Sequence, residues 1–329
     1  MSLTRASRSV LASRRSLLGA AVGGFAATTA GAQTVGAAVV GKDGWLFPLW
    51  DKVGPLNTPE VRQTTQIMGQ AIGILRSAGI ATTVALIPSK SRTYRQFLPD
   101  GMRVAPDTDR RYAAAIADYR AAGAITPDID TPFRTRASGP DPIFFKSDTH
   151  WMPVGAEIAA TETAKAVAQA NVLPPSNRPG LQLGQPVAKT QPRGDLVRNL
   201  PEAQRASYAP ERYQIREQVA GSSTLLADDA ADVAMVGNSY SQPLYGFSSL
   251  LSNQLNRPVS LFWKPNNFGP YNILLSYLTS EGFKQQKPKM IVWVQLEWDI
   301  PALPTGSGWG QNAMPAEKFL GDVRRAVGA

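Results

Sequence analysis

Short apolar runs alternate with longer amphipathic stretches along most of the chain. Four runs rich in β-branched or aromatic residues predict buried strands, at residues 80–87, 232–236, 259–263 and 290–296. Stretches with apolar residues at helical spacing predict helices at residues 58–78, 107–122, 153–167 and 242–255, and another ending near 285. Such an alternation predicts an α/β fold with a mostly parallel sheet. Because the run at 290–296 is very apolar, we expect it to be a central strand.

Several segments fall outside this alternation. Residues 39–47 have the pattern of two short strands around a Lys-Asp-Gly turn, and a further short strand is predicted near residues 124–129. Residues 171–200 are rich in Pro, Gly and Asn and predict an excursion or lid over the sheet. Residues 304–329 predict a loop and one short helix, which is too little chain for a carbohydrate-binding module.

The first residues have the pattern of an export signal. Four arginines precede a weakly apolar run, and Ala30-Gly31-Ala32 has the small-x-small pattern of a signal-peptidase site. The pair Arg14-Arg15 is typical of the twin-arginine export route. We therefore expect a signal peptide at residues 1–32, a main domain at 33–303 and a C-terminal tail at 304–329. The mature protein is then periplasmic; the alternative, an uncleaved membrane anchor, is disfavoured by polar residues within the stretch 17–40.

Composition excludes several classes of chemistry. The 329 residues include no cysteine and one histidine, so thiol nucleophiles, disulfides, thiolate metal sites and His-rich zinc sites are excluded. We expect no cofactor and no metal. The formal net charge of +9 falls to about +5 when the four arginines of residues 1–32 are removed. These charges are spread out, unlike the basic face of a nucleic-acid binder, and an acidic glycan is a compatible partner.

His150 is the single histidine, so any imidazole chemistry near neutral pH depends on this residue. Asp148 lies two positions earlier, on the same face if the backbone is extended, where a carboxylate orients an imidazole and stabilises its protonated form. The alternative is a lone histidine beside an acid in a surface loop.

Ser239 follows directly on the predicted strand 232–236, within Gly237-Asn238-Ser239-Tyr240-Ser241, and precedes a predicted helix. A serine in such a turn projects from the carboxyl edge of the sheet, where open α/β sheets carry their sites, and the helix N-terminus offers backbone N–H groups to an anion. The alternative is that Ser239 or Ser241 only caps the helix. Together, serine, histidine and aspartate make the inventory of an acyl-transfer site. The Gly-x-Ser-x-Gly elbow of the α/β-hydrolases is absent, since Ser241 occupies its second glycine position.

The order aspartate, histidine, serine and the motifs around these residues resemble those of the alginate O-acetyltransferases of the AlgX/AlgJ type. The motifs that carry the resemblance span about residues 39–303; they are Gly41-Lys42-Asp43-Gly44-Trp45-Leu46-Phe47, Pro88-Ser89-Lys90, Asp148-Thr149-His150-Trp151, Gly194-Asp195-Leu196, Gly237-Asn238-Ser239-Tyr240-Ser241, Gly269-Pro270-Tyr271 and, loosely, Trp298-Asp299-Ile300-Pro301. The resemblance implies an SGNH-hydrolase-like fold, which is a flavodoxin-like three-layer sandwich with helices on both faces of the sheet.

The same resemblance implies roles and partners. Ser239 would be the nucleophile, His150 its general base and Asp148 the residue that orients His150. The substrate would be an exported polysaccharide, acetylated within an exopolysaccharide export complex by transfer from a membrane-bound O-acyltransferase. The chain departs from the family in having Asn238 where a threonine is frequent. With no room for a carbohydrate-binding module, it is closer to the single-domain AlgJ branch, and its glycan need not be alginate.

Other residues are assigned to the site with less support from the pattern. The oxyanion would be held by the Ser239 N–H and a second donor, for which Asn267, the Gly269 amide and Asn238 are candidates, although a turn-forming role suits Asn238 better. Four residues are candidates for a groove that binds a charged glycan, with solvated loops as the alternative: Lys90, Arg92, Tyr94 and Tyr271. Three tryptophans are expected to pack in the core or at its rim: Trp45, Trp151 and Trp298.

Two other functions fit the same residues. A carbohydrate acetylesterase of the SGNH type would use the same three side chains, with water instead of a sugar attacking the acetyl-enzyme. A non-catalytic scaffold would hold glycan within a secretion complex.

Overall fold

The computed structural model describes residues 34–35, 37–219 and 231–329. The predicted signal peptide therefore lies outside the described residues. Among the described residues, no helix is both long and apolar enough to cross a membrane.

Four parallel strands form the central sheet, in the order β4 (Ala81–Ile87), β9 (Met290–Leu296), β7 (Val233–Gly237) and β8 (Val259–Trp263). Strand β9, the last of these four in the chain, thus lies between β4 and β7, which confirms that residues 290–296 are central. The strand predicted near residues 124–129 is reduced to one bridge, between Ile125 and Thr83.

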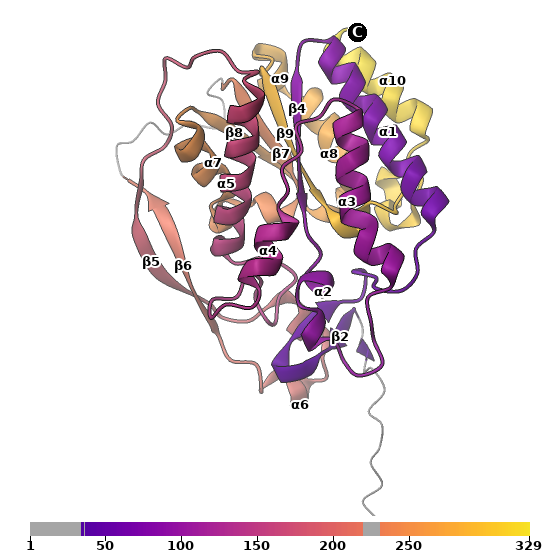
Figure 1. The fold of residues 1–329 in the computed structure, drawn as a ribbon, viewed down its shortest axis with the longest axis vertical. Coiled ribbons are helices and arrows are strands. Elements are labelled where there is room, and N and C mark those ends of the chain that lie inside the picture. The colour runs from indigo at the N-terminus through magenta and orange to yellow at the C-terminus, as the bar shows by residue number, and fades with distance from the viewer. Residues whose placement is uncertain (1–33, 36, 220–230) are drawn as a thin grey trace, which may run out of the picture. The chain divides into compact units, whose positions relative to one another are not determined.

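Helices cover both faces of this sheet (Figure 1). One face carries α5 (Pro153–Ala170) and α7 (Phe247–Leu255); the other carries α1 (Thr58–Ser77), α3 (Pro106–Ala121), α8 (Gly269–Leu278) and α10 (Ala316–Val327). Side chains of β9 alternate between the layers: Val292 and Val294 pack with α5 and α7, whereas Ile291 and Trp293 pack with the other helices. Burying each such side chain contributes about 1.5–3 kcal/mol. The three-layer sandwich is as predicted.

The remaining elements are short. The N-terminal strands β1 (Thr34–Val35), β2 (Ala38–Val40) and β3 (Leu46–Pro48) form a small antiparallel sheet. A second antiparallel pair is made by β5 (Leu183–Gln191) and β6 (Glu211–Gln218). The short helices are α2 (Lys90–Thr93), α4 (Asp130–Arg136), α6 (Glu202–Arg205) and α9 (Glu281–Gln285).

Three predicted elements differ from the structure. The excursion at 171–200 contains β5, and the β5–β6 pair lies beside α5 and α7 instead of over the sheet (Figure 1). The helix predicted at 242–255 begins only at Phe247, because Pro243 and the left-handed Gly246 (φ 78°) interrupt it, and 3₁₀ turns precede it. The helix ending near 285 is two helices, since Ser280 caps the start of α9.

Residues 304–329, set apart as a tail in the sequence analysis, contribute α10 to the helical layer beside α1 and α8 (Figure 1). Phe319 and Val323 of α10 are fully buried in the core that those helices share with the sheet.

Candidate active site

His150 lies beside the tip of a tight antiparallel turn, where its carbonyl accepts from the Phe145 N–H at 3.2 Å. Phe144 pairs with Trp151, and the Met152 N–H donates to the Ile143 carbonyl at 2.7 Å. The apolar side chains on both arms of this turn are buried, so the polar residues between them are held at its tip. The chain then enters α5 through Pro153, which favours the first turn of a helix.

Ser239 follows β7 at the carboxyl edge of the sheet, where ligands of such folds bind. A Cβ at Gly237 would lie 2.7 Å from the Cβ of Val294 in β9, so glycine lets the end of β7 pack closely against β9. Asn238 Oδ1 accepts from the Tyr240 N–H at 3.0 Å, which forms the turn. Ser239 therefore begins a 3₁₀ turn, not the α-helix N-terminus that the sequence analysis expected.

Two reciprocal hydrogen bonds connect the turn that carries His150 (residues 144–151, the histidine turn) to the turn that carries Ser239 (residues 237–241, the serine turn). Trp151 Nε1 donates to the Tyr240 carbonyl at 3.1 Å, and the Tyr240 hydroxyl donates to the Thr149 carbonyl at 2.5 Å. Both rings are buried, as predicted for Trp151, so these bonds are protected from water. This role of Tyr240 was not predicted from the sequence, although its position next to Ser239 was a signal.

Ser239, His150 and Asp148 form one hydrogen-bonded chain. Ser239 Oγ lies 2.9 Å from His150 Nε2, and His150 Nδ1 lies 2.7 Å from Asp148 Oδ1. With the proton on Nδ1 donated to the carboxylate, Nε2 is free to accept the serine proton. This arrangement can activate a hydroxyl as a nucleophile.

Four donors converge on the carboxylate of Asp148. Oδ1 accepts from the ring and the backbone N–H of His150, while Oδ2 accepts from Gln191 Nε2 at 2.6 Å and the Asp195 N–H at 2.9 Å. Burial alone would raise the pKa of Asp148, but the hydrogen bonds and charge of His150 lower it to about 2. The carboxylate is therefore ionised throughout the neutral range.

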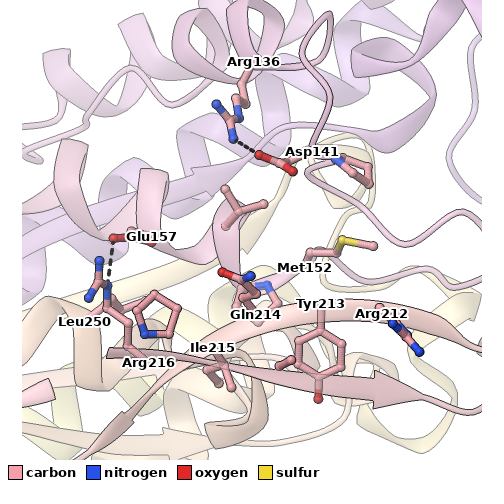
Figure 2. Close-up of a pocket in the computed structure, with 15 residues that line it drawn as sticks. Arg136, Asp141, Met152, Glu157, Arg212, Tyr213, Gln214, Ile215, Arg216 and Leu250 are labelled. Atoms are coloured by element: carbon pink, nitrogen blue, oxygen red, sulfur yellow. Dashed lines mark hydrogen bonds and ion pairs between the residues drawn. The ribbon is translucent and has the colours of Figure 1, made fainter. Parts of the chain in front are cut away.

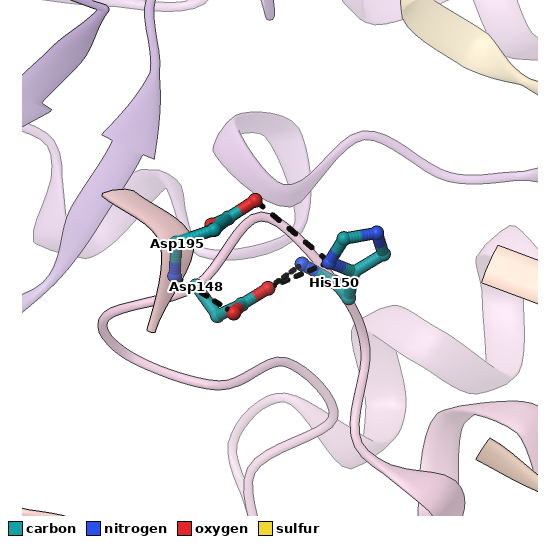
Figure 3. Close-up of side chains that lie close together, drawn as sticks. All are labelled: Asp148, His150 and Asp195. Carbon is teal, nitrogen blue, oxygen red and sulfur yellow. Dashed lines mark hydrogen bonds and ion pairs between the residues drawn. The ribbon is translucent and has the colours of Figure 1, made fainter. Parts of the chain in front are cut away.

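A second carboxylate, Asp195, lies beside the histidine ring (Figure 3). Its Oδ1 accepts from the Thr149 N–H at 2.7 Å, and its Oδ2 lies 3.9 Å from His150 Nδ1. Burial and the charge of Asp148 raise the pKa of Asp195. Asp148, His150 and Asp195 are also the group of described residues whose donor atoms are close enough to hold a metal ion. In this structure those of Asp148 and His150 are used in hydrogen bonds to one another and to the backbone.

Gly194 explains why the Gly-Asp-Leu motif lies against the turn that carries His150. A Cβ at Gly194 would lie 2.1 Å from the Ser147 carbonyl oxygen and 2.6 Å from the Asp148 nitrogen. We expect Gly194→Ala to push Asp195 away from Asp148, to destabilise the fold by about 1–3 kcal/mol and to lower acetyl-ester turnover about 10- to 100-fold. Urea denaturation and ester turnover measure the two effects. Gly282→Ala is the control, because nothing lies within 4 Å of a Cβ there; equal behaviour of the two variants would contradict the close-approach argument.

The serine and histidine open into a cavity of about 860 Å³ at the carboxyl edge of the sheet. Polar and aromatic side chains line it, including those of Ser239, His150, Asp195, Asn267, Trp298 and Asp299. A cavity of this size holds a ligand larger than one acetyl group.

Comparison with known proteins places the chain among acetyltransferases. Residues 38–297 match the family model described as SGNH hydrolase-like domain, acetyltransferase AlgX. The chain belongs to this family. The probable alginate O-acetylase AlgJ of Pseudomonas putida is 30% identical over 80% of this chain and 70% of its own. The alginate biosynthesis protein AlgX of Pseudomonas aeruginosa is 28% identical over 67% of this chain and 47% of its own.

Solved structures agree with the family assignment. The O-acetyltransferase domain of Pseudomonas putida AlgJ superimposes with a TM-score of 0.71 at 26% identity, covering 88% of this chain and 99% of that domain. Pseudomonas aeruginosa AlgX shares the fold, with a TM-score of 0.62 at 23% identity.

Lys90 is not a groove residue in this member of the AlgX-type family. It is fully buried, and its ammonium group donates to the carbonyls of Leu46, Lys146 and Asp148 at 2.6–3.1 Å. Burial lowers its pKa to about 8, although nearby acids such as Asp148 act in the opposite direction. Lys90 thus holds the backbone of the turn that carries His150 against β3.

Arg92 is likewise buried, where its guanidinium group pairs with Glu297 and Asp130. Arg92 therefore neither lines a glycan groove nor lies in a solvated loop, so both interpretations offered from the sequence are wrong. A buried arginine with two carboxylates is part of the structural support beneath the site.

The two tyrosines predicted for the groove are also buried. The Tyr94 hydroxyl accepts from the Ile143 N–H at 2.8 Å, and the Tyr271 hydroxyl donates to the Ala302 carbonyl at 2.9 Å. Tyr94 therefore supports the histidine turn, and Tyr271 supports the loop after β9.

The three oxyanion candidates have different surroundings. Asn267 is exposed and lines the cavity that contains Ser239 and His150. Gly269 is buried, and a Cβ there would lie 2.9 Å from the ring of Trp309, so this position provides space for that ring. Asn238 uses its side-chain oxygen to form the turn. Among these side chains, Asn267 is the one placed on the cavity wall.

Asn266 and Asp299, which the sequence analysis did not assign to the site, line the same cavity. Asn266 Nδ2 donates to Asp299 Oδ1 at 3.4 Å. Burial raises the pKa of Asp299 to about 7, although Asn266 and the charge of Arg111 act in the opposite direction. The partial match of Trp298-Asp299-Ile300-Pro301 was the available signal.

A second cavity of about 620 Å³ lies between α5 and the β5–β6 pair (Figure 2). Arg136 pairs there with Asp141 and Arg216 with Glu157, while Tyr213 lies at its base. Neither Ser239 nor His150 lines it. The family's chemistry is therefore assigned to the cavity that contains the serine.

Proposed function

We propose that this protein is an O-acetyltransferase that moves acetyl groups onto hydroxyls of an exported polysaccharide through an acetyl-Ser239 intermediate. The observation that carries the proposal is the hydrogen-bonded chain from Ser239 through His150 to Asp148, at the wall of a cavity large enough for a sugar. Family membership supports acetyl transfer. The names of two relatives refer to alginate, which supports a polysaccharide as the acceptor, either alginate or another glycan.

The first half-reaction forms the acetyl-enzyme. His150 Nε2 takes the proton of Ser239 as Oγ attacks the acetyl carbonyl of the donor. The resulting imidazolium is stabilised by Asp148, whose lowered pKa keeps it ionised. The Ser239 N–H and the side chain of Asn267 are the proposed donors to the oxyanion. His150 then returns the proton to the leaving group of the donor, and the C–O bond to that group breaks.

The second half-reaction releases the acetyl group to the acceptor. A sugar hydroxyl gives its proton to His150 Nε2 and attacks the acetyl carbonyl of the acetyl-serine. The tetrahedral intermediate collapses, the sugar ester leaves, and the proton returns to Ser239 Oγ. If water takes the place of the sugar, the same steps give an acetylesterase.

We further propose export to the periplasm, on the basis of Arg14-Arg15 and the small residues Ala30-Gly31-Ala32. A membrane-bound O-acyltransferase would then deliver the acetyl group within an exopolysaccharide export complex.

The purified protein, incubated with nitrophenyl acetate and oligosaccharides, tests the proposal. We expect acetylated sugar by mass spectrometry, formed in competition with free acetate. Acetate without acetylated sugar would instead indicate the esterase, and glycan binding without any turnover would indicate the scaffold.

A further inference from the structure

We propose that Asp299, with Asn266, forms the subsite that binds the hydroxyl groups of the acceptor sugar in the catalytic cavity. This inference rests on the proposed function and specifies how the second half-reaction selects a sugar over water.

The topology places Asp299 close to the nucleophile. Strands β7 and β9 are adjacent and parallel, and both end at the same edge of the sheet. Ser239 lies two residues after the end of β7, and Asp299 lies three residues after the end of β9. Both residues line one cavity. A ligand whose hydroxyl reaches Ser239 therefore lies within the space that Asp299 also borders.

The hydrogen bonding of Asp299 differs from that of the other buried acids around this cavity, of which Asp148 has been described above. Asp51 accepts from the hydroxyl of Ser89 and a backbone N–H, and Glu297 accepts from the Ser89 N–H and from Arg92. Each of those carboxylates has both oxygens occupied. Asp299 has one side-chain partner among the described residues, Asn266 at 3.4 Å on Oδ1, and its Oδ2 has none.

Asn266 is also incompletely satisfied. Its side-chain oxygen is buried and has no hydrogen-bond partner among the described residues. Leaving a buried polar group unpaired costs about 1–3 kcal/mol, so such groups call for an explanation. A carboxyl and an amide side by side, each with unused capacity, suit a ligand that can both donate and accept. Sugar hydroxyls have this property.

The other walls of the cavity fit a neutral sugar ring. Trp50 is 42% exposed and lines the cavity, so its aromatic face is available for the apolar face of a sugar. The charged side chains of the lining comprise two basic and three acidic residues, namely Lys52 and Arg111 against Glu60, Asp195 and Asp299. This excess of acidic over basic side chains does not favour binding of a sugar carboxylate near Asp299. We therefore infer that the subsite takes a neutral sugar in preference to a uronate.

Asp299→Asn in the full-length protein is the test, with two acceptors of equal length, a mannose and a mannuronate oligosaccharide. The donor is nitrophenyl acetate, and acetyl-Ser239 formation is measured separately by intact-protein mass spectrometry. We expect the wild type to transfer more efficiently to the mannose acceptor. In Asp299→Asn the KM for that acceptor should rise about tenfold or more, and the ratio of transfer to hydrolysis should fall accordingly, while acetyl-serine still forms.

Two further variants complete the design. Asn266→Ser should shift the same ratio in the same direction. Asp100→Asn, an exposed acid paired with Lys42, should leave it unchanged. Thermal melts check that each variant folds. The folded-state pKa of Asp299 lies above the unfolded value of 3.8, so ionisation of this carboxyl destabilises the folded protein as the pH rises from about 4 to 7. Asp299→Asn should therefore be at least as stable as the wild type at pH 8.

The outcomes separate the two proposals. Acetyl-serine without transfer to either sugar overturns the transferase function and, with it, the subsite. If Asp299→Asn transfers acetyl groups to sugar as well as the wild type does, the subsite alone is overturned. The same holds if transfer falls only in parallel with acetyl-serine formation. Preference of the wild type for mannuronate overturns the assignment of a neutral sugar.

Discussion

Ser239→Ala is expected to lower acetyl-ester turnover by roughly 10⁴-fold or more and to abolish the acetyl-enzyme. The reason is that Ser239 Oγ is the oxygen 2.9 Å from His150 Nε2 and would carry the acetyl group. Turnover of nitrophenyl acetate and the intact mass of the protein measure the two effects. Binding of oligosaccharide should persist, because the cavity walls remain.

Ser241→Ala is the matched control, two residues further along the same turn. The Ser241 hydroxyl is buried and has no hydrogen-bond partner among the described residues, so its loss should change turnover little. If Ser241→Ala loses the acetyl-enzyme and Ser239→Ala keeps it, the nucleophile has been assigned to the wrong serine.

Glu297→Gln should destabilise the protein by about 3–5 kcal/mol. Glu297 is fully buried at the end of β9, where it pairs with Arg92 and lies 3.2 Å from Arg111. Although burial alone would raise it, these arginines hold the pKa of Glu297 below its usual range. A neutral glutamine leaves the buried guanidinium groups of Arg92 and Arg111 without the negative charge that offsets their desolvation. Urea denaturation at neutral pH measures the loss.

Because the folded-state pKa of Glu297 is lowered, its contribution is fully present above the ordinary pKa of 4.5 and is lost as the pH falls through the lower value. The difference between Glu297→Gln and the wild type should therefore shrink in acid. Glu217→Gln removes an exposed pair with Lys189 and should have little effect. An equal loss of stability in both variants would show that the buried pairs of Glu297 stabilise the fold no more than the exposed pair of Glu217 does.

The central sheet could be predicted from sequence because its strands are apolar runs that differ clearly from the helices between them. Residues 290–296 are apolar enough to require burial on both faces, and they are central. The start of α7 was misplaced because local backbone preferences at Pro243 and Gly246 outweighed the helical spacing. The β5–β6 pair was missed because its strands are largely exposed and carry no strong apolar alternation.

Ser239, His150 and Asp148 could be brought together from sequence because a single histidine and a strand-end serine leave few combinations. Their roles remain predictions. The surroundings of Lys90 and Arg92 could not be predicted in this way. Long charged side chains usually reach solvent, and their burial depends on carbonyls and carboxylates from distant segments. Gln191 and Asp299 were not assigned because their partners, Asp148 and Asn266, also come from distant segments of the chain.

The position of β9 has a consequence for how the protein is made. Strands β4 and β7 each pair with β9 and not with one another, so a nascent chain that ends before residue 290 has two unconnected halves of the sheet. Residues between 296 and 309 contribute much of the lining of the cavity that contains Ser239, and they are translated after β4, β7 and β8. A chain that terminates before residue 290 therefore carries Ser239 and His150 without this part of the cavity lining.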